Sequence, residues 1–215
     1  IHHYRREKIG KAIHVTAGGG GAFLHPAPLE GARAEAQTQW PGPIQCRQLL
    51  HKVALHIMAG RSGLIAHAVM ALFFIPALGL VADDDARIIP AAITAGLFSA
   101  VAMALIGGVR KGPFLPISVL ATFAGCVLAL VPTLTVFAID EVFGLSGVHK
   151  FWWTTLALFT TLLAGGFVFG SFLAGLTLLG LESSQAFTAL SHPGFKHFVR
   201  LRVRADGSGV DVWCI

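Results

Sequence analysis

The sequence GLIAHAVMALFFIPALGLV, residues 63–81, begins a stretch that stays almost wholly apolar as far as Leu181. A membrane-spanning helix needs about 20 predominantly apolar residues. The stretch contains four runs of about that length, separated by short polar breaks: 63–81, 88–109, 113–139 and 151–180. Because lipid offers no partner to open backbone groups, each run is expected to be a helix. The pattern predicts a four-helix transmembrane domain over residues 62–181; the alternative is a large buried helical core of a soluble protein.

Composition and charge agree with a membrane protein. Hydrophobic residues make up 54% of the 215 residues and charged residues only 13%, which is typical of that class. The net charge of +5 suits an anionic membrane surface, so the lipid bilayer is an expected partner and nucleic acid is not. Cys46, Cys126 and Cys214 are far apart and lack metal-ligand spacing, which fits a reducing compartment.

The basic residues predict the orientation. Arg110 and Lys111 separate the second and third runs, and further basic residues precede the first run and follow the fourth: Lys52, Arg61, Lys196, Arg200, Arg202 and Arg204. The other two breaks are acidic, with Asp83, Asp84, Asp85, Asp140 and Glu141. Because basic loops stay cytoplasmic, both termini are expected on the cytoplasmic side.

Residues 1–43 read as two short strands and a linker around a glycine run. Residues 1–6 and 12–16 are β-compatible, and residues 27–43 are polar with prolines at both ends. Between them stand Gly18, Gly19, Gly20 and Gly21. Four glycines permit positive φ and close approach of a backbone. The run is either a flexible loop or a loop that passes close to a site.

Residues 44–61 have the spacing of an amphipathic helix. One face is apolar, with Cys46, Leu49, Leu50, Val53 and Ile57, and the other carries Arg47, Gln48, His51 and Lys52. Such a basic helix next to a span is expected to lie in the headgroup region. The alternative is a helix that packs within the soluble domain.

Two features of the apolar runs stand out. The fourth run carries small residues suited to close helix contact, namely Gly165, Gly166, Gly170 and Gly175. His67 is the one clear ionisable residue within the runs. It is either a functional group or a hydrogen-bonded structural one.

Residues 182–215 read as a short connection followed by a β-hairpin. Residues 198–204 alternate between apolar residues and arginines, residues 205–209 form a turn, and residues 210–215 return. A lone hairpin is marginal in water, so it is expected to join residues 1–16 in one sheet system. Val199, Leu201 and Val203 would then face the core against Ile13 and Val15, with the arginines toward solvent or headgroups.

The residues HHY at 2–4 and VTAGGGGAFLHP at 15–26 resemble the late part of calcineurin-like metallophosphoesterases, in particular a bacterial, membrane-embedded branch. The resemblance implies a helical membrane bundle of four transmembrane helices inserted between the late β-strands of a metallophosphoesterase-like α/β sandwich. Residues 1–43 and the closing hairpin of 182–215 would belong to a cytoplasmic domain at the bacterial inner membrane.

The same resemblance implies metal-assisted hydrolysis of a phosphate ester by a pair of divalent metals, Mn, Fe or Zn. His2 matches the last histidine of a late ligand motif, and His3 adjoins it. Gly18, Gly19, Gly20, Gly21 and His25 would form an active-site loop. Pro28 stands where the branch carries a second histidine, and the other ligand-bearing motifs of the family are absent. The chain is therefore expected to be a C-terminal fragment without catalytic residues, inactive alone.

Three functions compete. The first is the membrane phosphoesterase, with an unspecified phosphate ester as substrate. The second is a non-catalytic membrane anchor or sensor with a degenerate phosphoesterase domain. The third is a small transporter component, which His67 alone supports weakly because the runs contain no row of charged residues.

Overall fold

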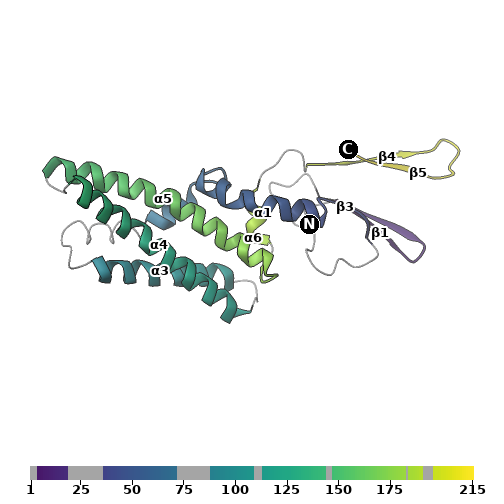
Figure 1. The fold of residues 1–215 in the computed structure, drawn as a ribbon. Coiled ribbons are helices and arrows are strands. Elements are labelled where there is room, and N and C mark those ends of the chain that lie inside the picture. Colours follow the sequence, from purple (N-terminus) through teal and green to yellow (C-terminus); the bar gives the residue numbers. More distant parts are fainter. Residues whose placement is uncertain are drawn as a thin grey trace. The chain divides into compact units, whose positions relative to one another are not determined.

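The computed structural model describes residues 4–18, 36–71, 88–108, 113–143, 147–182, 184–190 and 196–215. The chain forms two compact units. One comprises Ile1–Lys52 with Ser183–Ile215, and the other comprises Val53–Glu182. The described residues are mostly helical, with two small sheets (Figure 1).

The first sheet has three strands in the order β2-β1-β3. β1 (Tyr4–Ile9) and β2 (Ala12–Ala17) are antiparallel, with a register that runs from Tyr4 opposite Ala17 to Ile9 opposite Ala12. The tight turn between them uses Gly10 at φ +61, a conformation that glycine adopts without a steric penalty. β3 (Ala36–Trp40) pairs with the other edge of β1.

The second sheet is the hairpin that the alternating pattern predicts. β4 (Val199–Val203) pairs with β5 (Val210–Cys214), and Phe198 and Ile215 extend the ladder by two backbone hydrogen bonds of 3.0 Å. The hairpin was expected to join residues 1–16 in one sheet system, with Val199, Leu201 and Val203 facing its core. This expectation is wrong for the described residues. The hairpin is a sheet of its own, and Leu201 and Val203 are 65% and 72% exposed. Alternation determines which residues share a face, but it does not determine what covers that face.

α1 (Pro43–Met58) has the two faces that its spacing predicts. The apolar residues Cys46, Leu49, Leu50, Val53 and Ile57 are buried, whereas Arg47, Gln48, His51 and Lys52 are exposed. Protein atoms cover the apolar face, and the part of α1 from Val53 onward belongs to the helical unit. The interfacial location of residues 44–61 stays a prediction. α6 (Ser184–Thr188) is a short helix whose Phe187 is fully buried.

In its described residues the second unit has the long helices α3 (Ile88–Gly108), α4 (Phe114–Phe143) and α5 (Gly147–Leu178), and a helical segment at residues 65–71. Among the described residues, α4 and α5 are long and apolar enough to cross a membrane, over Phe114–Val131 and Thr154–Leu178. α3 contributes a shorter apolar stretch, Ala92–Leu105. The described chain thus shows two candidate spans rather than four, and most of the first predicted run lies outside it.

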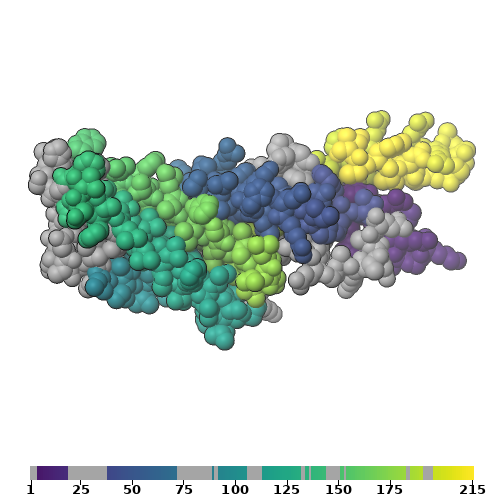
Figure 2. All heavy atoms as spheres, viewed as in Figure 1, coloured from purple at the N-terminus to yellow at the C-terminus, as the bar shows by residue number. Residues whose placement is uncertain are grey.

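The outer surface of this second unit is apolar. Only 33% and 39% of the two candidate spans are buried. Large apolar side chains that are more than half exposed occur along all three long helices, for example Phe98, Leu105, Leu115, Phe123, Phe137 and Phe159. Figure 2 shows the teal and green atoms of these helices at the surface of the unit. The core helices of a soluble protein would bury such side chains instead.

Small residues bring the helices of this unit close together. A methyl group built on Gly125 of α4 would lie 2.6 Å from the carbonyl oxygen of Gly96 and 2.8 Å from the backbone nitrogen of Ala100, both in α3. On α5, a methyl group on Gly170 would lie 2.5 Å from Cα of Ala54 in α1. The glycine face predicted for the fourth run is therefore a packing surface, as expected for helices that approach through small residues.

Candidate functional site

The residues predicted to form the metal site precede β1 or follow β2 in the sequence. His2, His3, Gly19, Gly20, Gly21 and His25 are outside the described residues, whereas Gly18 directly follows β2. Tyr4 pairs with Ala17, so the chain enters β1 and leaves β2 at the same end of the ladder. The histidine pair and the glycine run are therefore joined to the same end of one hairpin, although they are far apart in the printed sequence.

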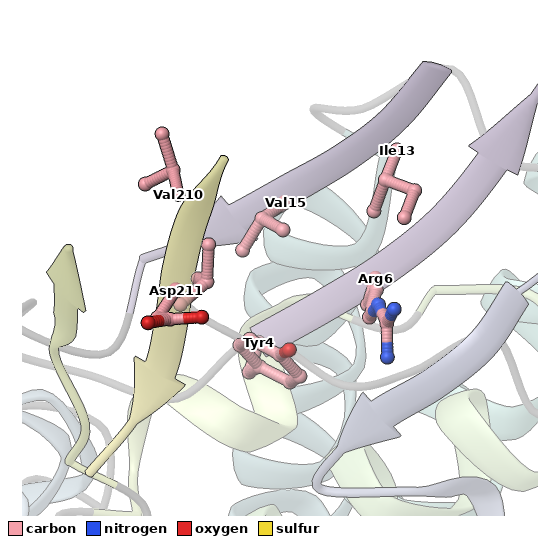
Figure 3. A pocket seen from close by; sticks show the side chains of 7 residues that line it. Tyr4, Arg6, Ile13, Val15, Val210 and Asp211 are labelled. Carbon is pink, nitrogen blue, oxygen red and sulfur yellow. The ribbon is translucent and has the colours of Figure 1, made fainter. Parts of the chain in front are cut away.

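A cleft of about 380 Å³ lies in the same unit, beside this ladder (Figure 3). Tyr4 and Arg6 of β1 and Ile13 and Val15 of β2 line one side. These four residues share a face of the ladder, because side chains alternate along each strand and the register aligns them. The other side comprises Val210, Asp211 and Val212. Three consecutive residues of one strand point alternately to both faces, so the cleft runs along the edge of β5.

The polar groups of the cleft are already engaged in part. Asp211 Oδ1 accepts hydrogen bonds from Arg204 Nε at 3.0 Å and Nη2 at 2.6 Å. The ring of Tyr4 packs edge-on against His197, with 5.8 Å between centroids. The exposed guanidinium of Arg6 also lines the cleft, among aliphatic side chains. Such a cleft can bind an amphipathic anion, but its lining includes no nucleophile beside a general base.

The part of the chain that the structure describes contains no group of three or more histidine, cysteine or acidic side chains that could hold a metal ion. The metal pair that the resemblance implies therefore stays a prediction. His2 and His3, which would supply only part of such a site, precede β1 and are outside the described residues.

His197 is a buried polar residue that sequence reasoning missed. It lies just before β4, is buried, and contacts Tyr4 at the other end of the chain. A lone histidine between Lys196 and Phe198 has no local signal, because its environment depends on a contact between residues far apart in the sequence. The contact joins the two segments that make up the first unit.

His67 has a structural partner. Its Nε2 lies 3.1 Å from the carbonyl oxygen of Met58, the last residue of α1, and therefore donates the proton. The preceding carbonyls of α1 are bonded by a turn in which Gly60, at φ +67, donates to Ile57 and Arg61 donates to His56. His67 thus completes the hydrogen bonding of a helix end that Gly166 approaches closely. This geometry favours the structural interpretation of His67.

No family model, curated protein or solved structure matches the chain. The likeness to metallophosphoesterases therefore rests on the residues that carry it, 2–4 and 15–26. Of these, the structure describes Tyr4 and residues 15–18, and it places them at one end of a single β-ladder.

Proposed function

We propose that this chain belongs to an integral-membrane, metal-dependent phosphoesterase that hydrolyses a phosphate ester at the cytoplasmic face. The observation that carries the proposal is the β1–β2 register, in which Tyr4 pairs with Ala17. It joins His2, His3 and the glycine run to one end of the same hairpin. A metal ligand and a loop without side chains are useful together only if both reach the same site.

The membrane part of the proposal rests on the helical unit. Within the described ranges, two helices are long and apolar enough to cross a membrane, and most of their surface is not covered by protein. We infer that α3 and residues 63–81 complete a set of four spans, because these segments are equally apolar. The basic residues beside the spans support a cytoplasmic location of both termini, and the resemblance implies a bacterial inner membrane.

The proposed chemistry requires ligands beyond those named here. A bound pair of divalent metals, Mn, Fe or Zn, would polarise the phosphoryl group and activate water. In this chain His2 would contribute a neutral imidazole, with His3 beside it. Gly18, Gly19, Gly20, Gly21 and His25 would leave room for the substrate. Two imidazoles cannot hold two metals, so further ligands must come from elsewhere in the polypeptide.

A second candidate is a membrane anchor or sensor without catalysis. It requires only the helical unit, in which two of the described helices are long and apolar enough to cross a membrane. A transporter has less support. The buried hydroxyls of Thr161 and Thr177 bond to backbone carbonyls of their own helix, at 2.7 and 3.1 Å, and so do not form a polar path.

The proposal is tested by changing His2 to alanine in the longest polypeptide that carries this sequence. Loss of groups that only support a ligand costs about 10–100-fold in metal affinity, so loss of a ligand should cost at least as much. Metal content after dialysis and phosphodiesterase activity are the measurements. His14→Ala is the matched control, because His14 lies on β2 and is exposed.

We expect His2→Ala to lose metal and activity while His14→Ala retains both. Equal, small effects of the two substitutions would contradict ligation by His2. Absence of bound metal from the unmodified protein would instead support the anchor or sensor.

A further inference from the structure

The hairpin β4–β5 has two chemically different faces. Side chains alternate along each strand, and the register places Val199 opposite Cys214, Leu201 opposite Val212 and Val203 opposite Val210 on one apolar face. Arg200 lies opposite Trp213, and Arg202 lies opposite Asp211, on the other face. Arg204 follows Arg202 in the same alternation and belongs to this second face. We call the whole set the basic face: Arg200, Arg202, Arg204, Asp211 and Trp213.

The basic face carries excess positive charge. Three guanidinium groups stand against one carboxylate, and that carboxylate is bonded to Arg204 at 2.6 Å. Arg200 and Arg202 are both exposed, and neither forms an ion pair with another residue in the described part of the chain. Figure 2 shows side chains standing out from the yellow surface of this hairpin. The charge of these two arginines is therefore available to an anionic partner.

Trp213 identifies the kind of anionic partner. It lies directly across from Arg200 and is 43% exposed. A half-exposed tryptophan among arginines suits the boundary between lipid headgroups and acyl chains, where the indole ring is partly apolar and its N–H meets water. A partner recognised by charge alone would not favour an exposed indole on the same face.

Chain connectivity limits how far the hairpin can be from a bilayer. α5 ends at Leu178 and β4 begins at Val199, and a connection of that length spans at most about 70 Å. If α5 crosses the membrane, its end holds the hairpin at a high local concentration near one leaflet. The cytoplasmic leaflet carries anionic lipids, which attract basic segments near the surface.

We propose that the basic face binds the headgroups of anionic phospholipids in the leaflet at the C-terminal end of α5. Arg200 and Arg202 supply the charge, Trp213 lies at the headgroup boundary, and the ion pair with Asp211 holds Arg204. This inference rests on the membrane placement within the proposed function, but not on phosphoesterase activity.

The first test uses the unmodified chain in bilayer nanodiscs, which leave both leaflets open to solvent. Trypsin cleaves after arginine and lysine, so it reports whether Lys196, Arg200, Arg202 and Arg204 are accessible. We expect slower cleavage in discs of phosphatidylcholine with phosphatidylglycerol than in discs of phosphatidylcholine alone. Salt at about 1 M, where the Debye length is roughly 3 Å, should remove the difference. Equal cleavage rates in the two lipids would overturn the proposal.

The second test asks whether the basic face is responsible. With Trp40, Trp152 and Trp153 changed to phenylalanine, iodide quenching reports on Trp213 alone. Arg200→Gln with Arg202→Gln should reduce the lipid-dependent protection by roughly thirtyfold, which corresponds to about 2 kcal/mol for two arginines. Lys8→Gln with Lys11→Gln is the matched control, because it removes two exposed positive charges from the β1–β2 hairpin.

We expect protection to survive in the lysine variant. An equal loss in both double variants would show an effect of net charge and would overturn the assignment to the basic face. Extraction of the protein from membranes by alkaline carbonate would overturn the membrane placement, and this inference with it. Firm retention without any dependence on anionic lipid would overturn this inference alone.

Discussion

Gly170 shows how one missing side chain can determine the approach of two helices. The atoms nearest to a methyl group built there belong to the backbone of α1. They are Cα of Ala54, at 2.5 Å, and the backbone nitrogen of Ala54, at 3.1 Å. Backbone atoms of a helix cannot move aside as the tip of a flexible side chain can. Close approach at this position therefore requires glycine, and Gly166 plays a similar part where Cα of Met58 lies 3.0 Å away.

We predict that Gly170→Ala destabilises the protein by about 1–3 kcal/mol, the usual cost of forcing extra atoms into a packed contact. The measurement is the free energy of unfolding in mixed micelles, followed by circular dichroism. Gly175→Ala is the control, because a methyl group there would meet Cδ2 of Leu120 at 3.5 Å, an ordinary contact. Equal stability of the two variants would show that α1 and α5 do not meet as closely as described.

Single residues also show what a sequence can and cannot predict. The buried and exposed faces of α1 followed from its spacing, because helical periodicity is a local property. The contact between Tyr4 and His197 did not, since it joins residues at opposite ends of the chain. The partner of His67 lies nine positions away, and only the turn at Gly60 brings Met58 within reach.

At the scale of the element, the β4–β5 turn is held by its own side chains. Asp206 Oδ1 accepts hydrogen bonds from the Ser208 backbone nitrogen at 3.0 Å and the Ser208 hydroxyl at 2.8 Å. These bonds, to the backbone first and the hydroxyl second, lower the pKa of the Asp206 carboxyl below its ordinary value of 3.8. Gly207, at φ +69, completes the turn by donating to the Arg204 carbonyl at 3.0 Å.

We predict that acid loosens this turn. Because the pKa of Asp206 is lowered in the folded hairpin, its contribution to stability is full above the ordinary value of 3.8 and is lost as the pH falls through the folded pKa. Amide chemical shifts of Val203 and Val210, followed by NMR from neutral pH to about pH 2.5, provide the measurement. Asp206→Ala should be looser at neutral pH and should lack this transition. The same transition in both proteins would assign it to another group.

Elements were more predictable than their surroundings. Period-2 alternation located β4 and β5, and the apolar runs located α3, α4 and α5 to within a few residues. The expectation that Val199, Leu201 and Val203 pack on Ile13 and Val15 was wrong, because it is residues of β5, not β4, that line the cleft beside Ile13 and Val15. Alternation of apolar and polar residues determines which side chains share a face of a strand. It does not determine which strand of a hairpin lies nearer to a second sheet, because that depends on tertiary structure.

For the whole molecule, charge around the spans predicts a topology that can be tested directly. Reporter fusions after Lys111 should be cytoplasmic, whereas fusions after Asp84 should be on the opposite side, because basic loops are retained and the acidic break is not. Fusions on the same side of the membrane would contradict an odd number of spans between these positions. A fusion after Ile215 should match the one after Lys111.

The division of the chain into structural units was only partly predictable from the sequence. The sequence indicated that the first and last segments stand outside an apolar middle, and the structure groups those two segments in one unit. The candidate site could not be predicted from the sequence, for a physical reason. Its cleft depends on residues from both ends of the chain, and the proposed metal pair needs ligands that His2 and His3 cannot supply alone.

The apolar exterior of α3, α4 and α5 has a thermodynamic consequence. In a bilayer, those side chains meet hydrocarbon whether the helices are associated or apart, so separating the helices hydrates little apolar surface. The accompanying change in heat capacity should fall far below the roughly 12–15 cal/mol/K per residue of soluble domains. Cohesion between α3 and α4 then comes from dispersion attraction where Gly96 and Gly125 let the backbones touch. Hydrophobic stabilisation weakens on cooling, but it contributes little to the association of these helices in a bilayer. Cold alone would therefore not dissociate the bundle.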